Sequence, residues 1–206
     1  MPTKPTTQLK KSERTRRLIV EKAAPLFNKQ GYWGTSLQDI IEATGLTKGS
    51  IYGNFSGKDE LAVAVFKHNS HYILRKVKSI TQSDNNASRK LFMITDFYRQ
   101  YIYSPELSGG CPILNTATEA DDSHPDLKDL ALEALDYVRR SFIHILNNGI
   151  RSGEFNPEIE VEQTATLFLG LIEGGILQTK LYNKSKYLLD CLNHIDQTVK
   201  EMCMQK

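Results

Sequence analysis

Hydrophobic spacing constrains this chain most strongly, because apolar residues recur every three or four positions in nearly every segment. Such spacing is typical of amphipathic helices, and the period-two alternation of a half-buried strand is absent. In residues 11–30, for example, one face carries Ile19, Ala23, Leu26 and Phe27. Turn-forming residues separate segments of about 8 to 25 residues. We therefore expect an all-α protein of about nine helices.

Capping and stop signals predict where these helices begin and end. Thr35 to Gln38 has the form of a capping box, while Thr47 and Ser56 stand where they would cap the next two helices. Asn156 with Pro157 is a further cap-and-proline start. The expected helices span residues 11–30, 35–43, 47–54, 57–80, 87–103, 112–120, 126–151, 157–183 and 185–202.

Composition excludes several classes of protein. Hydrophobic residues make up 40% of the chain and charged residues 24%, as in an ordinary soluble protein. No apolar run approaches the roughly 18 residues needed to span a bilayer, and the polar, lysine-bearing start does not resemble a signal peptide. The three cysteines lack the spacing of a disulfide framework or a metal site. We expect a cytoplasmic protein with no membrane contact, no metal and no cofactor.

Charge is distributed unevenly along the chain. Residues 1–60 carry ten Lys and Arg against six Asp and Glu, a net +4, so the remainder must be −2 to give the overall +2. A basic N-terminal part on a slightly acidic body suits a module that faces phosphates. Charge alone is equally compatible with a solvated, flexible basic tail, which we expect over residues 1–11.

Residues 34–61, GTSLQDIIEATGLTKGSIYGNFSGKDEL, predict a helix-turn-helix. Two short helices are joined by a turn that contains Gly45, and the apolar side chains between them are enough for one small core. The second helix carries polar side chains on its outer side. Such a helix fits the major groove of DNA, which is about 12 Å wide, and presents its first residues to base edges.

This stretch resembles the DNA-binding signature of the tetracycline-repressor (TetR) family. The signature has a G-x-T-S opening, a G-[VL]-[ST]-[KR]-G-[ST]-[LIV]-Y recognition helix and a closing F-x-x-K-[DE]-x-L. The resemblance covers about residues 12–72, and beyond it the family shares architecture more than sequence. The matching residues are Gly34, Thr35, Ser36, Gly45, Leu46, Thr47, Lys48, Gly49, Ser50, Ile51, Tyr52, Phe55, Lys58, Asp59 and Leu61.

The resemblance implies an N-terminal three-helix DNA-binding domain over residues 12–72, with its motif at about 35–54. It also implies a helical effector-binding and dimerisation domain over residues 73–206. The implied contacts with bases or phosphates are made by Thr35, Thr47, Lys48, Gly49, Ser50, Tyr52, Asn54 and Lys58. Thr35 and Thr47 are equally interpretable as helix caps, and Gly49 as a place where the backbone approaches DNA closely.

Glycines inside the apolar run LFLGLIEGGIL suggest a helix contact. Gly170 and Gly174 lie four residues apart, so two helix backbones can approach closely there. We interpret them as part of a dimer interface, because a two-fold dimer reads a palindromic operator. The alternative is a close contact within one chain.

The segment GGCPILNTATEA suggests a sensor. Cys111 lies at the expected start of a helix, and Asn115 and Glu119 follow on the same face. The segment also resembles one in a branch of the family whose cysteine senses electrophiles or oxidants. Cys111, Asn115 and Glu119 are therefore effector or sensor candidates, although a buried cysteine often has only a packing role.

These observations predict a repressor that binds a palindromic operator in double-stranded DNA as a homodimer and is released by a small-molecule or electrophile effector. The alternative is a DNA-binding protein with no effector. An enzyme is disfavoured, because no nucleophile elbow, P-loop, dinucleotide fingerprint or metal motif occurs in the sequence.

Overall fold

The computed structural model describes residues 11–101, 103, 109–120 and 123–204, so residues 1–10 of the tail expected over 1–11 lie outside the described residues, and Lys11 begins the first helix. Within that part of the chain nine helices form, and the isolated bridge between Phe155 and Cys203 is its one strand-like pairing. The all-α prediction is confirmed. The helices are α1 (Lys11–Gly34), α2 (Leu37–Thr44), α3 (Lys48–Tyr52), α4 (Lys58–Thr81), α5 (Ala87–Tyr101), α6 (Pro112–Ala120), α7 (Pro125–Arg151), α8 (Val161–Tyr182) and α9 (Lys186–Met202).

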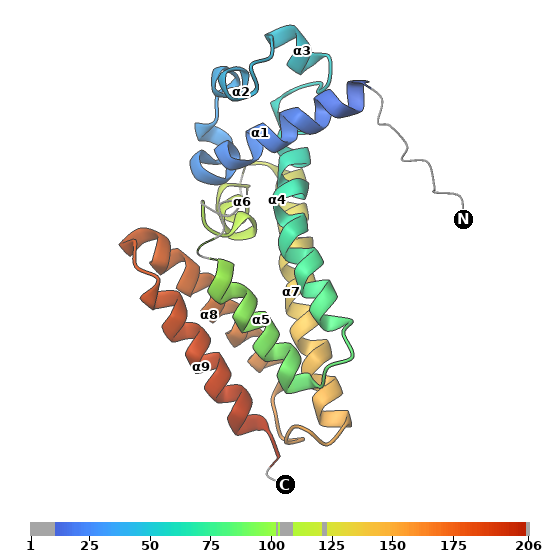
Figure 1. Ribbon diagram of the computed structural model, residues 1–206, viewed down its shortest axis with the longest axis vertical. Helices are drawn as coiled ribbons and strands as arrows, with labels where there is room; N and C mark the ends of the chain where they lie inside the picture. Colours follow the sequence, from blue (N-terminus) through green and yellow to red (C-terminus); the bar gives the residue numbers. More distant parts are fainter. Residues whose placement is uncertain (1–10, 102, 104–108, 121–122, 205–206) are drawn as a thin grey trace, which may run out of the picture.

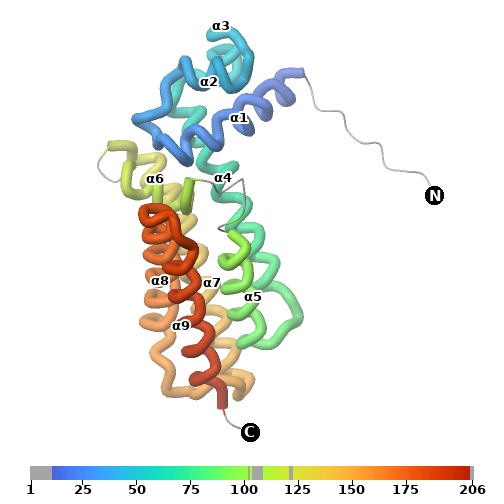
Figure 2. The backbone as a smooth tube through the Cα atoms, turned by 60° about the vertical axis from the view of Figure 1, so that its left-hand side comes forward, coloured from blue at the N-terminus to red at the C-terminus, as the bar shows by residue number. Residues whose placement is uncertain are grey.

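The helices form two parts that share α4. Helices α1 to α3 gather at one end of an elongated molecule, and α4 runs from them into a body made of α5 to α9 (Figure 1). There α4 packs against α7, and α9 packs against both α5 and α8. Figure 2 shows α8 and α9 side by side along the outside of the body. The short α6 lies directly beneath α1 and contacts it.

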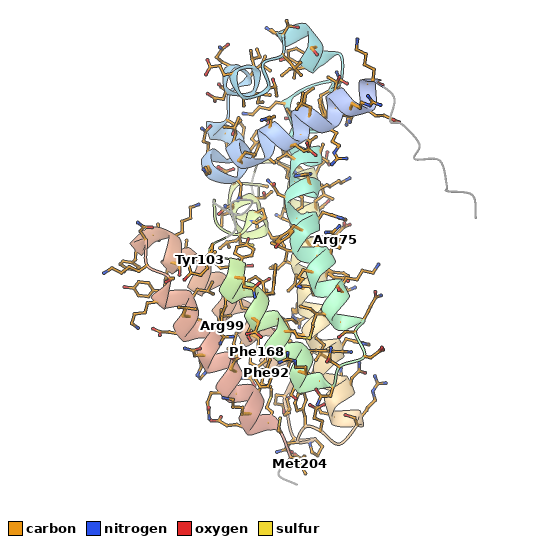
Figure 3. All side chains as sticks on the ribbon, in the orientation of Figure 1. Arg75, Phe92, Arg99, Tyr103, Phe168 and Met204 are labelled. Carbon is orange, nitrogen blue, oxygen red and sulfur yellow. The ribbon has the colours of Figure 1, made fainter. Side chains whose placement is uncertain are left out.

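One continuous apolar core runs through both parts. The expected face of α1 is inside, with Ile19 and Ala23 fully buried and Phe27 nearly so. Further down, Arg99 of α5 forms an ion pair with Asp196 of α9 at the edge of this core (Figure 3). No helix among the described residues is both long enough and apolar enough to cross a membrane.

Three helix starts differ from the sequence prediction. Ser36, not Thr35, caps α2, and its partner in the capping box is Asp39, whose carboxylate accepts the Ser36 backbone N–H at 2.7 Å. Ser56 does not cap α4 with its side chain. Its N–H and hydroxyl both donate to Glu60, and Gly57 takes the cap position without a side-chain bond. The start of α8 at Pro157 is also wrong, because α8 begins only at Val161.

The segment before α8 is held by the C-terminus instead. The Asn156 N–H donates to the carbonyl of Met202, and the Asn156 side chain accepts from the N–H of Glu158 at 3.0 Å. These bonds form a local turn that competes with a helical start. The pairing partner lies 46 residues away, so the sequence nearby cannot reveal it.

Helix α1 breaks at Gly31. This residue has φ 77° and ψ 179°, a backbone conformation open almost only to glycine, and one more helical turn follows to Gly34. The expected end of the first helix, at residue 30, directly precedes this break, and Pro25 lies within the helix. The break places Tyr32 and Trp33 at the junction between the two parts.

Candidate functional site

The expected recognition helix α3 is short and held by its caps. The Thr47 hydroxyl accepts the Ser50 backbone N–H at 3.2 Å, so the predicted cap at Thr47 is confirmed. Gly45, in the preceding turn, has φ 68°, a left-handed conformation that suits glycine. Buried Ile51 fixes the inner side of the helix against the core. The outer side is therefore presented in one defined orientation.

That outer side carries most of the predicted DNA contacts. Lys48, Gly49 and Tyr52 are exposed, Tyr52 to 48%, and Ser50 is partly exposed. The Lys48 ammonium lies 5.9 Å from the centre of the Tyr52 ring. A side chain at position 49 would meet only the Thr47 hydroxyl, at 4.0 Å, so glycine leaves the backbone open to close approach from outside.

Asn54 and Arg16 anchor the end of α3. The Asn54 amide donates to the Ser50 carbonyl at 2.8 Å, and the Asn54 carbonyl accepts from Arg16 of α1. Arg16 also lies over the Phe55 ring at 3.9 Å and pairs with Glu60 of α4 at 2.6 Å. One arginine thus joins α1, α3 and α4. Sequence reasoning missed it, because its partners lie 38 and 44 positions away.

Glu60 completes this anchor. The Ser56 N–H, Arg16 and the Ser56 hydroxyl lower the pKa of Glu60 from 4.5 to about 2. The carboxylate is therefore ionised at neutral pH and holds both the start of α4 and Arg16.

Thr35 and Lys58 do not lie on the open face of α3. Thr35 is fully buried, and its hydroxyl donates to the Gly31 carbonyl at 2.7 Å, so this side chain faces the core. The Lys58 ammonium lies 4.5 Å from the centre of the Tyr32 ring. Burial lowers the pKa of Lys58, while the charge of Asp59 opposes that shift.

The three sensor candidates separate into two places. Cys111 is 2% exposed and its thiol donates to the Glu173 carboxylate of α8 at 3.2 Å. Burial raises the pKa of the Cys111 thiol well above its usual value, and the Glu173 charge raises it further. The thiol is therefore protonated and covered, which does not suit a reactive thiolate. The backbone N–H groups of Leu114 and Ile113 at the start of α6 lower this pKa, but burial outweighs them.

Glu173 is itself unusual. Burial raises the pKa of its carboxyl to about 7, and within the described residues its Oε2 atom is buried without a hydrogen-bond partner. The pair Cys111–Glu173 joins the start of α6 to the middle of α8.

Asn115 and Glu119 face α1 instead of α8. The Asn115 amide donates to the carbonyls of Asn28 and Gly109, at 3.0 and 2.8 Å. The Glu119 carboxylate accepts the Tyr32 backbone N–H at 2.6 Å, directly after the break in α1. These two residues therefore connect α6 to α1, and both line a small cavity there.

Gly170 and Gly174 lie on an open face of α8. A methyl group at either position would meet nothing within 4 Å, whereas one at Gly175 would meet Leu188 of α9 at 2.9 Å. The alternative of a close contact within the chain therefore applies to Gly175 and not to the predicted pair. The same helix exposes large apolar side chains at Leu167, Leu177, Leu181 and Tyr182, between 45 and 72% exposed.

Comparison with known proteins gives matches over both parts of the chain. Residues 19–65 match the family model described as bacterial regulatory proteins, TetR family, and residues 87–195 match the tetracyclin repressor-like C-terminal domain. A solved TetR-family transcriptional regulator from Cytophaga hutchinsonii is 35% identical with a TM-score of 0.86, and the match covers 97% of this chain and 100% of that one.

Two further relatives agree. The structure of a TetR transcriptional regulator from Chloroflexus aurantiacus J-10-FL is 32% identical with a TM-score of 0.88, covering 95% of this chain and 98% of that one. The HTH-type transcriptional regulator TtgR of Pseudomonas putida is 27% identical over 182 residues, which is 86% of each chain.

Proposed function

Because this chain belongs to the TetR family of DNA-binding transcriptional regulators, we propose that it is a repressor that binds a palindromic operator as a homodimer and leaves it when a small molecule binds. The family consists of regulators and not enzymes. We propose a repressor and not an activator because residues 87–195 match the tetracyclin repressor-like model. The place of action is the cytoplasm, where the operator is accessible.

The outer side of α3 carries this proposal. It is short, capped at Thr47 and fixed from below by buried Ile51. Lys48, Gly49 and Tyr52 stand open on it. Lys48 has the reach and the donors to bond the O6 and N7 atoms of guanine, while Tyr52 suits a phosphate. Ser50 and Asn54 contribute at the edge of this surface.

Dimerisation follows from what one recognition helix can read. A single α3 contacts only a few base pairs, so two copies held by a two-fold axis are needed for a specific operator. The open face of α8 supports this step, because Gly170 and Gly174 allow close approach between exposed apolar side chains. Large exposed apolar patches on a globular protein are typical of interfaces.

The effector in this proposal is a non-covalent ligand. The buried, protonated thiol of Cys111 disfavours attack on an electrophile. Asn115 and Glu119, which line a cavity against α1, are better placed to respond to a ligand. Treatment with N-ethylmaleimide tests this choice. Wild type and Cys111→Ser are expected to keep the same operator affinity after treatment, and a selective loss in wild type would favour a covalent effector.

Selection from a random pool of double-stranded DNA tests DNA recognition. We expect enrichment of a palindrome, with binding that weakens steeply as salt rises. Lys48→Ala is expected to relax base preference at one symmetric pair of positions, and the matched control is Lys78→Ala in the last turn of α4. Failure to enrich any sequence would refute the proposal. A uniform weakening by Lys48→Ala, with a flatter salt slope, would reassign Lys48 to a phosphate.

A further inference from the structure

A small cavity lies where the DNA-binding part meets the regulatory body. It is enclosed by α1, α4, α6 and α7, the helices that converge around the upper end of α4 in Figure 1. The space measures about 30 Å³, enough for one or two water molecules. Apolar side chains such as Phe27, Val65 and Leu127 line it, together with polar ones such as Asn69, Asn115 and Thr116.

One residue that lines this cavity, His124, has a buried polar atom without a partner among the described residues. His124 caps α7, and its Nδ1 atom accepts the Leu127 backbone N–H at 3.4 Å. A neutral ring that accepts at Nδ1 carries its proton on Nε2. The residue is only 9% exposed, and Nε2 is buried without a hydrogen bond among the described residues. The nearest carboxylate oxygen, on Asp59, is 3.9 Å away.

The cavity also borders the break in α1, through Tyr32 and Glu119. The Glu119 carboxylate accepts the Tyr32 N–H at 2.6 Å and sits against Gly31, where a methyl group would lie only 1.8 Å from Glu119 Oε1. Glu119 therefore bonds to the hinge of the DNA-binding part while it lines the cavity. Any movement of the Glu119 side chain therefore acts directly on the break in α1 at Gly31, which we call the hinge.

We propose that this cavity is the binding site for a small uncharged molecule with an apolar body and one hydrogen-bond acceptor oxygen. The Nε2 proton of His124 needs an acceptor, and the apolar walls suit the rest of such a molecule. An anion would meet the carboxylates of Glu119 and Asp59. A cation offers no lone pair to the Nε2 proton, and the carboxylate that lines the cavity, on Glu119, already accepts the Tyr32 N–H.

Binding at this site opens the junction. A molecule larger than water fits only when Glu119 swings away from the Tyr32 N–H, so the ligand binds the open arrangement more tightly. Operator DNA binds only one spacing of the two recognition helices. Ligand binding therefore lowers the affinity for the operator by the same factor by which operator binding lowers the affinity for the ligand. This coupling rests on the proposed function, whereas ligand binding itself does not.

Three six-membered rings of nearly equal size test the site on the full-length protein without DNA. Tetrahydropyran has the acceptor oxygen, cyclohexane lacks it, and piperidine is a cation at pH 7. Binding is measured by saturation-transfer NMR and by the emission of Trp33, the one tryptophan in the chain, whose ring packs on Tyr32 with centroids 4.9 Å apart. We expect saturable binding of tetrahydropyran, at least about five-fold weaker binding of cyclohexane, and none of piperidine.

Substitution of the histidine locates the binding site. His124→Asn keeps an acceptor for the α7 cap but removes the Nε2 donor, and His144→Asn, an exposed position on the same helix, is the control. We expect His124→Asn to bind tetrahydropyran about five-fold more weakly and His144→Asn to bind as wild type does. Equal affinity in all three proteins would overturn the proposal, as would equal binding of the three rings to wild type.

If His124→Asn does not fold, the comparison of the three rings in wild type decides alone. Operator selection distinguishes the two proposals. A protein that enriches an operator but does not bind tetrahydropyran refutes this site and leaves the repressor proposal intact.

Discussion

Gly31→Ala should destabilise the protein more than an ordinary glycine substitution at positive φ. The backbone at Gly31 has φ 77° and ψ 179°, and holding a non-glycine residue there costs about 1–3 kcal/mol. The new methyl group would also lie 1.8 Å from Glu119 Oε1, so the carboxylate must leave the Tyr32 N–H. Losing that charge-assisted bond costs about 1.5–3 kcal/mol. We expect a decrease of about 3–5 kcal/mol in the free energy of unfolding.

Gly153→Ala is the matched control. Gly153 has φ 71°, yet a methyl group there would meet nothing within 4 Å, so only the backbone cost of about 1–2 kcal/mol applies. Urea unfolding at one fixed protein concentration measures both variants. Repeating Gly31→Ala in a Glu119→Ala background removes the collision, and the cost should fall to the backbone contribution alone. Equal costs for Gly31→Ala and Gly153→Ala, within about 0.5 kcal/mol, would refute the claim that Glu119 is held against the hinge.

Three other outcomes follow from the described contacts. The pKa of Glu60 is lowered to about 2, so its contribution to stability is present above about pH 4.5 and is lost as pH falls towards 2. Glu60→Gln should therefore show a smaller loss of stability between about pH 4.5 and 2 than wild type when unfolding is measured with urea. The pKa of Glu173 is raised to about 7, so its ionisation lowers the stability of the protein as pH rises from about 4.5 to 7. At about pH 8 the urea midpoint of Glu173→Gln should be at least as high as that of wild type. Between about pH 5 and pH 8 the midpoint of the variant should change less than that of wild type. Leu177→Asp on the open face of α8 should give monomers in analytical ultracentrifugation, whereas Leu18→Asp on α1 should not; a dimeric Leu177→Asp would exclude this face as the interface.

Local signals in the sequence predicted the helices well. Apolar spacing placed Ile19 and Ala23 inside, and cap chemistry located the start of α3 at Thr47. One error arose where two local signals competed. Thr35 and Ser36 are both good caps, and the choice fell to Ser36 because Thr35 is drawn into the core by its bond to the Gly31 carbonyl.

Local signals in the sequence could not predict contacts between residues that lie far apart in the chain. The partners of Arg16, Glu119 and Glu173 lie 38 to 87 positions away in the chain. A carboxylate in a helix pattern predicts only a solvated surface, so nothing marked Glu119 as a bond to the hinge or Glu173 as buried. The helical spacing of Cys111, Asn115 and Glu119 suggested one cluster, but the two ends of α6 face different neighbours.

The position of α6 explains why its two ends have separate partners. Its start is joined to α8 by the bond from Cys111 to Glu173, and its end is joined to the hinge of α1 by the bond from Tyr32 to Glu119. If α8 forms the dimer interface, the spacing between the two recognition helices is set through α8, α6 and α1 in each subunit. A nine-residue helix is short and stiff, so a displacement at either end is transmitted to the other. In this proposal, a ligand that moves Glu119 therefore acts through α6 on the start of α6 at Cys111 and so on α8.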